Sequence, residues 1–385
     1  MRLSVVVSSL VAAVVGFGST LALVIAAAAA VGATTQQTAS MVTAVCLAKA
    51  AEALFLSWWT RMPVITAWST PGAALLGAST GFTMADAVGA FIGAALLLML
   101  TGLMRPLTRL VSMIPSSVAS GMLAGIVVAF VMGAARAVGM DAILVLPLLL
   151  AFFVLRLFNP ALSVLAVLVG GAVLALALGR VGSLPAFELS TLVWTSPDFS
   201  LTAFIGLAVP LYLVTMASQN LAGIAVLRAA GYNPPTGLLI GTTGFVSLLS
   251  APFNALTTNL AAISAAICTD PDAHPDAGKR WLTGPFYALW YVVFAIFGAS
   301  LVALFDVLPQ SLILLVAGVG LLAPLTNALG LAMADPTERV PAIVAFSVTA
   351  SGLTIGGVGA AFWGLVAGLF VLVLDRLAAR RRKRR

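Results

Sequence analysis

Long apolar runs follow one another along the whole chain, each bounded by charged residues, proline or glycine. This pattern constrains the fold most, because a chain in lipid must satisfy its backbone groups internally, as helices do. The sequence is 62% apolar and 8% charged, whereas soluble domains carry roughly 25% charged residues. We therefore predict an all-α polytopic membrane protein with about 14 transmembrane segments. The predicted spans are residues 4–31, 37–59, 64–79, 84–103, 117–137, 141–157, 160–179, 200–222, 236–248, 250–268, 283–304, 309–332, 340–355 and 357–377.

We interpret the first run, residues 3–31, as a retained span. A cleaved signal peptide is the alternative, because the run ends in alanines that resemble a cleavage site. The run is far longer than the ~7–15 residues of a typical signal core.

Two of the spans are interrupted by a proline. In the third span, the β-prone stretch 63–68 precedes Thr70, a good N-cap, and Pro71, which suits a first helical turn. A second Ser-x-Pro element, Ser250 to Pro252, lies about half a chain later. Residues 236–268 are too few to cross a membrane twice as full helices, whereas extended chain covers about twice the distance per residue. We predict that the third and tenth spans are each part strand and part half-helix, with the two Ser-x-Pro elements at equivalent places.

The positive charges predict the orientation. Fourteen spans place most arginines and lysines, including the basic tail 380–385, on the side of both termini. Only Arg136 and Arg180 fall on the other side, so the positive-inside rule predicts that both termini are cytoplasmic. The net charge of +7 is spread over short loops and the tail, which argues against a nucleic-acid partner and for the lipid bilayer as the surroundings.

Seven spans fall in each half, so two similar halves must be inverted relative to each other. We expect the first inverted repeat in residues 1–190 and the second in residues 191–385. The segment 180–199 would connect them and would contain an amphipathic surface helix. The stretch 104–116, with Arg105, Arg109 and Pro115, would lie along the cytoplasmic interface.

The two half-helix starts form the main candidate binding site. In inverted repeats they would enter from opposite faces and meet near the midplane, where their positive dipole ends and free N–H groups attract an anion, typically a carboxylate. The alternative is that Pro71 and Pro252 only kink ordinary helices. The candidate residues at these starts are Thr70, Pro71, Gly72, Ala73, Phe253, Asn254, Thr257, Thr258 and Asn259.

Polar residues in the eighth span are a second part of this candidate site. Ser218, Gln219 and Asn220 are expensive in lipid and should face the protein interior. They would donate hydrogen bonds to a ligand, or would act as interhelical contacts. Thr257 and Thr258 have the same two interpretations, as ligand contacts or as a helix cap.

Lys49 and Glu52 lie three residues apart in the second span and share a helix face. An ionisable pair inside a membrane is a candidate proton relay or gating pair. A mutually neutralised structural pair is the alternative. His274, in the polar loop 270–276, has a titration range that suits proton transfer, although a solvated loop histidine is the simpler interpretation.

Catalytic signatures are missing from the sequence. We find no nucleophile elbow, metal-ligand spacing or phosphate loop, and predict neither an enzyme nor a cofactor. Cys46 and Cys268 fall in apolar spans and are expected to be reduced and buried. Asp86 opens the fourth span as an N-terminal dipole partner.

Short motifs in both halves resemble those of the benzoate:proton symporters of bacterial inner membranes, the BenE type. The matching stretches are WSTPGAALL at 68–76, VTMASQN at 214–220, RAAGY at 228–232, NLAAISAAIC at 259–268, PDAHPD at 271–276 with Arg280 and Trp281, VTASGLT at 348–354 and AFWGL at 361–365. The resemblance covers essentially the whole chain.

This resemblance implies a fold similar to the uracil permeases and sulfate-transporter-like carriers. Spans 1–4 and 8–11 would form a core domain, spans 5–7 and 12–14 a gate domain, and a homodimer is common. Uracil permeases have acidic residues where this chain has Ser218 or Gln219 and Thr257 or Thr258. The absence of acidic residues at these positions fits an anionic substrate, which carboxylates would repel. Asn254 and Leu256 stand where the family often has glycine and sometimes histidine.

The combined interpretation is a carrier that imports benzoate or a similar small aromatic carboxylate with protons across the inner membrane. The carboxylate would lie at the half-helix starts, the ring against Phe253 and Trp68, and Gln219 and Asn220 would orient it. Glu52 and Lys49 are the candidates for proton coupling. The alternatives are a same-fold carrier of another small anion or a nucleobase, or a passive channel.

Overall fold

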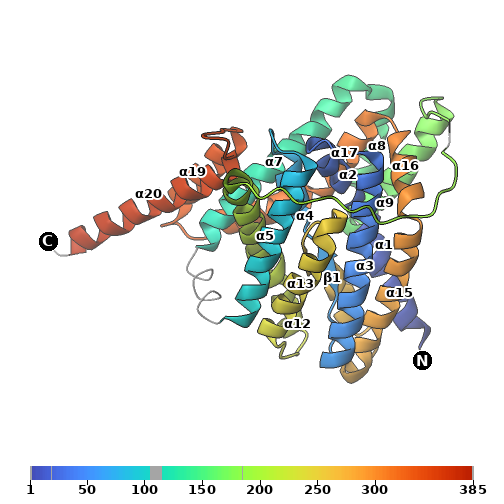
Figure 1. The fold of residues 1–385 in the computed structure, drawn as a ribbon, viewed down its shortest axis with the longest axis horizontal. Helices are drawn as coiled ribbons and strands as arrows, with labels where there is room; N and C mark the ends of the chain where they lie inside the picture. The colour runs from blue at the N-terminus through green and yellow to red at the C-terminus, as the bar shows by residue number, and fades with distance from the viewer. Residues whose placement is uncertain (1, 19, 105–114, 184, 384–385) are drawn as a thin grey trace.

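The computed structural model describes residues 2–18, 20–104, 115–183 and 185–383, and its regular structure is almost entirely helical (Figure 1). Within this described part, eight helices are long and apolar enough to cross a membrane, and a ninth span is the bent pair Ala277–Ile296 and Gly298–Asp306. The chain is thus a multi-pass membrane protein. In the first half the elements are α1 (Leu3–Gly18), α2 (Leu21–Ala30), α3 (Thr35–Thr60), β1 (Thr66–Trp68), α4 (Thr70–Gly77), α5 (Met84–Leu103), α7 (Ser116–Met140), α8 (Ala142–Leu155) and α9 (Pro160–Ala177).

The second half begins with one long helical segment that contains two π-helical turns. Its parts are α10 (Leu201–Ala203), the π-helix η1 (Phe204–Ala208), α11 (Val209–Val214), the π-helix η2 (Thr215–Asn220) and α12 (Leu221–Ala229). It continues with α13 (Thr236–Ser250), the 3₁₀ turn η3 (Ala251–Phe253), β2 (Thr258–Leu260), α14 (Ile263–Thr269), the 3₁₀ helix η4 (Ala277–Leu282), α15 (Thr283–Ile296), α16 (Gly298–Asp306), α17 (Gln310–Gly320), α18 (Leu322–Ala332), α19 (Arg339–Ala350) and α20 (Ala360–Lys383).

The third span has the predicted form of a short strand followed by a half-helix. The cap, however, is Ser69 and not Thr70: the Ser69 Oγ accepts a hydrogen bond from Gly72 N, and Thr70 is the first helical residue. Pro71 occupies the first turn, where its missing N–H costs nothing. Asp86 also lies as predicted, in a capping box with Thr83 at the start of α5.

The second break differs from the prediction. The Ser250–Pro252 element ends α13 and does not start the half-helix, which begins only at Ile263. The residues that follow Pro252 decide this. Asn254 takes the left-handed conformation at φ 71°, which stops the helix, and the β-prone residues Thr257 and Thr258 then continue as extended chain.

The two short strands meet as an antiparallel pair that joins the halves of the chain. Thr66 lies opposite Leu260, Ala67 opposite Asn259, and Trp68 opposite Thr258. Opposite residues share a face of the sheet and successive residues alternate. One face therefore presents Ala67 and Asn259, and the other presents Thr66, Trp68, Thr258 and Leu260. Ala67 is the partly exposed member of β1.

The helices pack in two groups around the paired strands β1 and β2, a place here called the strand crossing. In one group α3 packs on α15 and α16, α5 on α13, and α1 on α14 and α15. In the other group α7 packs on α17, α18 and α19, α8 on α9, and α19 on α20. The turn η2 contacts both β2 and α7, and α4 also contacts α7, so the strand crossing lies where the two groups meet. The carboxyl end of α20 projects beyond the rest of the molecule (Figure 1).

The segment between the halves contains no helix in residues 185–199, so the predicted surface helix is wrong. This segment, here called the strap, runs as extended chain (green in Figure 1) because its backbone groups bind other elements. Ser190 N donates to Ile296 O, Thr195 N to Pro252 O and Asp198 N to Ala85 O. The predicted interfacial stretch 104–116 lies almost wholly outside the described residues.

Candidate functional site

The start of α4 lies at the strand crossing, and Ser69 connects it to three elements. Its hydroxyl caps α4 at Gly72 N and shares a 2.8 Å hydrogen bond with Thr215 Oγ1 of η2. Its backbone N donates to Thr257 O beside β2. The predicted set of binding residues includes neither Ser69 nor Thr215, although Ser69 stands directly before Thr70-Pro71 and is itself a strong N-cap residue.

The predicted residues of α4 are at this start. Pro71, Gly72 and Ala73 are buried, whereas Thr70 is partly exposed and its hydroxyl lies 3.4 Å from that of Thr20. Gly72 permits the close approach of α11, because a Cβ built on it would lie 2.3 Å from Leu211 Cδ1. A side chain at this position would therefore displace Leu211, which packs directly on the backbone of α4.

The predicted polar cluster of the eighth span coincides with η2. A π-helical turn holds one more residue than an α-turn and is frequent at functional sites. Asn220 is fully buried, and its Oδ1 accepts from Leu260 N at 2.9 Å, so this residue holds β2 in place. Ser218 is partly exposed and donates to Val214 O in its own helix. Gln219 is also partly exposed, and its amide has no partner among the described residues.

The predicted residues around the second break fall into two separate places. Asn259 lies at the strand crossing, and in the orientation that satisfies its amide the oxygen accepts from Ser69 N at 3.1 Å. Thr257 is buried there with an unpartnered hydroxyl. Phe253 and Asn254 instead contact the strap. The Phe253 ring lies 5.6 Å from that of Trp194, and Asn254 Nδ2 donates to Val193 O. The grouping of Phe253 and Asn254 with the half-helix starts is therefore wrong.

Thr258 faces away from α4 and η2, towards α3 and α13. Its hydroxyl donates to Glu52 Oε1 and lies 2.9 Å from Ser247 Oγ, which also accepts from Thr258 N. This contact belongs to the second face of the strand pair, opposite to the face of Asn259. The structure therefore separates Thr258 from the other predicted ligand contacts.

Lys49 and Glu52 lie beside each other on α3 but do not bind each other. Both side chains are fully buried, and the ion pairs of the described residues do not include this pair. Lys49 Nζ lies over three aromatic rings, at 3.6 Å from the centroid of Tyr291, 5.0 Å from Trp68 and 5.7 Å from Tyr287. The two side chains therefore form no direct ion pair in the described conformation.

Trp68 belongs to the aromatic cluster around Lys49, together with Tyr287 and Tyr291. It is 1% exposed, it stacks on Phe17 at 5.4 Å, and its Nε1 donates to Gly16 O. The prediction that Trp68 supplies a ring wall at the half-helix starts is therefore wrong for the described conformation. A small apolar pocket lies next to Gly72 instead. Its lining residues are Gly72, Leu75, Leu76, Phe91, Leu207 and Leu211.

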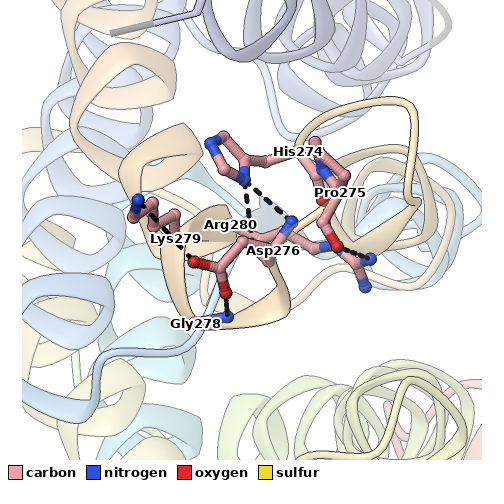
Figure 2. A network of polar contacts seen from close by, with 6 residues as sticks. All are labelled: His274, Pro275, Asp276, Gly278, Lys279 and Arg280. Carbon is pink, nitrogen blue, oxygen red and sulfur yellow. Dashed lines mark hydrogen bonds and ion pairs between the residues drawn. The ribbon is translucent and has the colours of Figure 1, made fainter.

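The loop after α14 positions this half-helix from its other end (Figure 2). Arg280 is buried and donates to Thr269 O, the end of α14, and to His274 O. A cation there is favourable because the carboxyl end of a helix is its negative pole. His274 is 8% exposed and its Nδ1 accepts from Asp276 N. His274 is thus a buried structural residue and not the solvated one that we expected.

Comparison with known proteins identifies relatives along the whole chain. Residues 1–374 match the family model described as BenE, benzoate membrane transport protein. The chain is 40% identical over 374 residues to "Inner membrane protein YdcO" of Escherichia coli, covering 96% of both chains. It is 33% identical over 369 residues to "Benzoate membrane transport protein" of Acinetobacter baylyi, covering 95% of this chain and 94% of the other.

Two solved structures share the fold. The transmembrane domain of a cyanobacterial bicarbonate transporter, BicA, aligns with a TM-score of 0.59 at 17% identity over 98% of both chains. A structure of SLC26A9 aligns with a TM-score of 0.64 at 13% identity, over 97% of this chain and 65% of that one. At such low identity these two likenesses concern the fold alone.

Proposed function

This chain belongs to the BenE family of benzoate membrane transport proteins, and from that premise we propose that it imports benzoate or a related small aromatic carboxylate together with protons. It is a membrane transporter and not an enzyme. The proposal concerns the substrate, the proton coupling and the site. The binding residues that we propose are Thr70, Gly72, Ser218, Gln219 and Asn259, with Ser69 and Thr215 added to the predicted set.

The observation that carries the proposal is the apolar pocket beside the first turn of α4. A positive helix end attracts a carboxylate, and the adjoining small cavity is lined by apolar side chains, among them Phe91, Leu207 and Leu211, against which a ring would pack once the cavity widens. The pocket is small in the described conformation, so we expect it to widen when the ring enters. Pro71 and Ala73 shape the turn and make no side-chain hydrogen bond to the substrate.

The lack of charged residues at the strand crossing supports an anionic substrate. The elements β1, α4, η2 and β2 contain no acidic or basic residue. A carboxylate there meets only hydroxyl, amide and backbone donors and is not repelled. Gln219 is the strongest candidate for orienting the substrate, because it is partly exposed and its amide is free to form new bonds.

The packing supports two inverted repeats, in residues 1–190 and 191–385, that form a core and a gate. In two inverted repeats, each span of the first half is equivalent to the span seven places later. The second span (α3) is then equivalent to the ninth (α13), and the fourth (α5) to the eleventh (α15). The α5–α13 contact then corresponds to the α15–α3 contact, and both are extensive. Likewise the α8–α17 contact corresponds to α7–α19. Transport would occur by movement of the core, spans 1–4 and 8–11, against the gate, spans 5–7 and 12–14.

The proposed setting is the bacterial inner membrane, with both termini in the cytoplasm. The excess of Arg and Lys on one side of the predicted spans supports this orientation. One relative is named an inner membrane protein. A homodimer is part of the proposal, and the mass of the purified protein in detergent tests it.

Uptake of labelled benzoate into proteoliposomes tests the function. With an inward proton gradient we expect saturable accumulation that salicylate inhibits and that uracil and sulfate do not. Protein-free liposomes and a dissipated gradient are the controls. Uptake of sulfate or uracil in place of benzoate would move the substrate to the same-fold alternative, and flux that does not saturate would indicate a channel.

A further inference from the structure

We infer that Glu52 carries the coupled proton and that Thr258 transmits its protonation state to the strand crossing. The inference rests on the proposed proton-coupled function and names the group that performs the coupling. Its basis is a chain of contacts that runs from a buried carboxyl group on α3, through β2, to the capped start of α4.

The Glu52 carboxyl group has the hydrogen bonding of a neutral acid. It is fully buried, one oxygen accepts from the Thr258 hydroxyl, the Thr66 hydroxyl lies beside the carboxyl group, and Oε2 has no partner among the described residues. An ionised carboxylate offers about four acceptor positions and is strongly disfavoured without partners in an apolar interior. The described conformation therefore corresponds to protonated Glu52, and loss of the proton requires new donors, such as water or a rearranged neighbour.

Lys49 does not replace these donors. Its ammonium group lies over the rings of Tyr291, Trp68 and Tyr287, which attract a cation electrostatically. Two of the rings are held by their hydroxyls: Tyr287 donates to Thr66 O and Tyr291 to Ala13 O. Lys49 is thus balanced by the aromatic cluster and is free of a direct contact with Glu52.

Among the described residues, the titratable side chains around Glu52 and Lys49 include no second carboxyl group. Lys49 acts on Glu52 electrostatically. Cys46 of α3 and the rings of Tyr287 and Tyr291 of α15 lie beside Lys49, and Cys268 of α14 lies beside Tyr287. Among the charged residues on elements that pack against α3, Asp306 of α16 contacts Thr35 at the first turn of α3. Lys279 and Arg280 lie on η4, whose Trp281 ring lies under Arg61 at the other end of α3. Glu52 is the only carboxyl group among the buried residues that the structure describes.

The Thr258 hydroxyl converts the protonation state into a change of hydrogen bonds. It has one proton. When Glu52 is ionised, Thr258 must donate that proton to it. When Glu52 is protonated, Glu52 itself can donate, and Thr258 is released to donate to Ser247 Oγ, 2.9 Å away, or to Thr243 O at 3.4 Å. Ionised Glu52 can only accept from Thr258, whereas protonated Glu52 can accept, as in the described conformation, or donate. Protonation thus permits the Glu52–Thr258 hydrogen bond to reverse.

This reversal occurs one residue from the proposed substrate site. Thr258 N donates to Ser247 Oγ, and the adjoining Thr257 O accepts from Ser69 N, at the cap of α4. Across the strand pair Thr258 lies opposite Trp68, whose ring contacts Lys49. One proton bound at Glu52 can therefore favour one arrangement of the α4 cap, and a substrate bound at the cap must then favour the proton equally, because linkage is reciprocal. Glu52 takes up this proton on one side of the membrane and releases it on the other, without change in any covalent bond.

The test compares Glu52→Gln with Thr258→Val and with the matched control Glu188→Gln. Glutamine keeps the shape of Glu52 and cannot ionise, and valine keeps the shape of Thr258 without its hydroxyl. Glu188 is exposed on the strap, and only its backbone groups form hydrogen bonds. For each protein the measurements are benzoate exchange at equal pH, benzoate accumulation driven by a proton gradient, and benzoate affinity across a pH series.

We expect Glu52→Gln to retain exchange but to lose gradient-driven accumulation and the pH dependence of its affinity. Thr258→Val should weaken accumulation relative to exchange, and Glu188→Gln should match the unmodified chain. Accumulation by Glu52→Gln that equals that of Glu188→Gln overturns the inference. Loss of exchange and accumulation together in a folded Glu52→Gln protein also overturns it, because Glu52 would then serve transport as a whole. Failure of the unmodified chain to bind or exchange benzoate is a different result and rejects the proposed function.

Infrared spectroscopy of the purified protein supplies a readout that needs no substrate. The unmodified chain and Glu188→Gln should both show the band of a protonated carboxyl group at neutral pH, and Glu52→Gln should lack it. A band that persists in Glu52→Gln would place the proton on another group and would contradict the inference even if benzoate is not the substrate.

Discussion

Ser69 and Thr215 share a 2.8 Å hydrogen bond that joins the cap of α4 to the π-helical turn η2. The two residues are 146 positions apart and belong to different halves of the chain. Both are fully buried, so a change at either is felt at the other. The bond makes the start of the half-helix and the polar turn of the eighth span parts of one site.

Ser69→Ala should lower both stability and benzoate affinity. It removes the N-cap of α4, which typically costs about 1 kcal/mol, and leaves Thr215 without its partner. Thermal unfolding in detergent and benzoate titration measure the two effects. Ser79→Ala is the control, because Ser79 donates to Leu75 O at the other end of α4. Equal affinities in the two variants would exclude Ser69 from the site.

Gly72→Ala should abolish uptake. Its Cβ would lie 2.3 Å from Leu211 Cδ1 and 2.7 Å from Ser69 Oγ, so it would push the Leu211 side chain into the apolar pocket and disturb the cap hydroxyl. Gly139→Ala serves as the comparison, since a Cβ at Gly139 meets nothing within 4 Å. Uptake assays and melting temperatures of both variants decide the matter, and a Gly72→Ala protein with normal uptake would show that the pocket is not used.

Gln219→Ala and Asn220→Ala should fail in different ways. Gln219 is partly exposed with a free amide, so its loss should abolish uptake and leave the melting temperature unchanged. Asn220 accepts from Leu260 N in the interior, and removal of a buried acceptor costs roughly 1–3 kcal/mol. Asn220→Ala should therefore melt at a lower temperature. Uptake by Gln219→Ala at the unmodified rate would remove Gln219 from the site.

Lys49→Met should fold about as well as the unmodified chain. Methionine nearly fills the volume of the lysine stem, and replacement of a buried charge by an apolar group of similar shape is often neutral. Lys49→Ala should instead lose about 2–5 kcal/mol, because it leaves a cavity among Trp68, Tyr287 and Tyr291. Unfolding curves of both variants are the measurement. Equal losses in the two proteins would show that the ammonium group itself holds the aromatic cluster together.

Much of the fold could be predicted from the sequence because its signals are local. Apolar length identifies the long helices, and a β-prone stretch before Ser-Thr-Pro identifies β1 and α4. The second break was misplaced because a Ser-x-Pro element is compatible with either end of a helix. The left-handed Asn254 and the pairing of β2 with β1 decide between the two ends, and both depend on contacts that no short segment contains.

The sequence predicts which segments contain the polar residues of the site, but not which residues contact one another there. Polarity within an apolar span pointed to η2 and to Lys49 and Glu52. It could not indicate the partners of these groups, because they come from the other half of the chain: Thr258 for Glu52, and the ring of Tyr291 for Lys49. Phe253 and Asn254 were misassigned since the strap that they contact has no periodic pattern to predict it.

The strap also bears on the order of assembly during synthesis. Two of its contacts, Val193 N to Ser40 Oγ and Asp198 N to Ala85 O, involve only residues made before or within the strap itself. Its contacts with Pro252, Ile296 and Ser300 require residues that the ribosome adds later. The first half of a nascent chain can therefore bind the strap against α3 and α5. The strap then presents unpaired backbone donors and acceptors, which α13, α15 and α16 bind when they are synthesised.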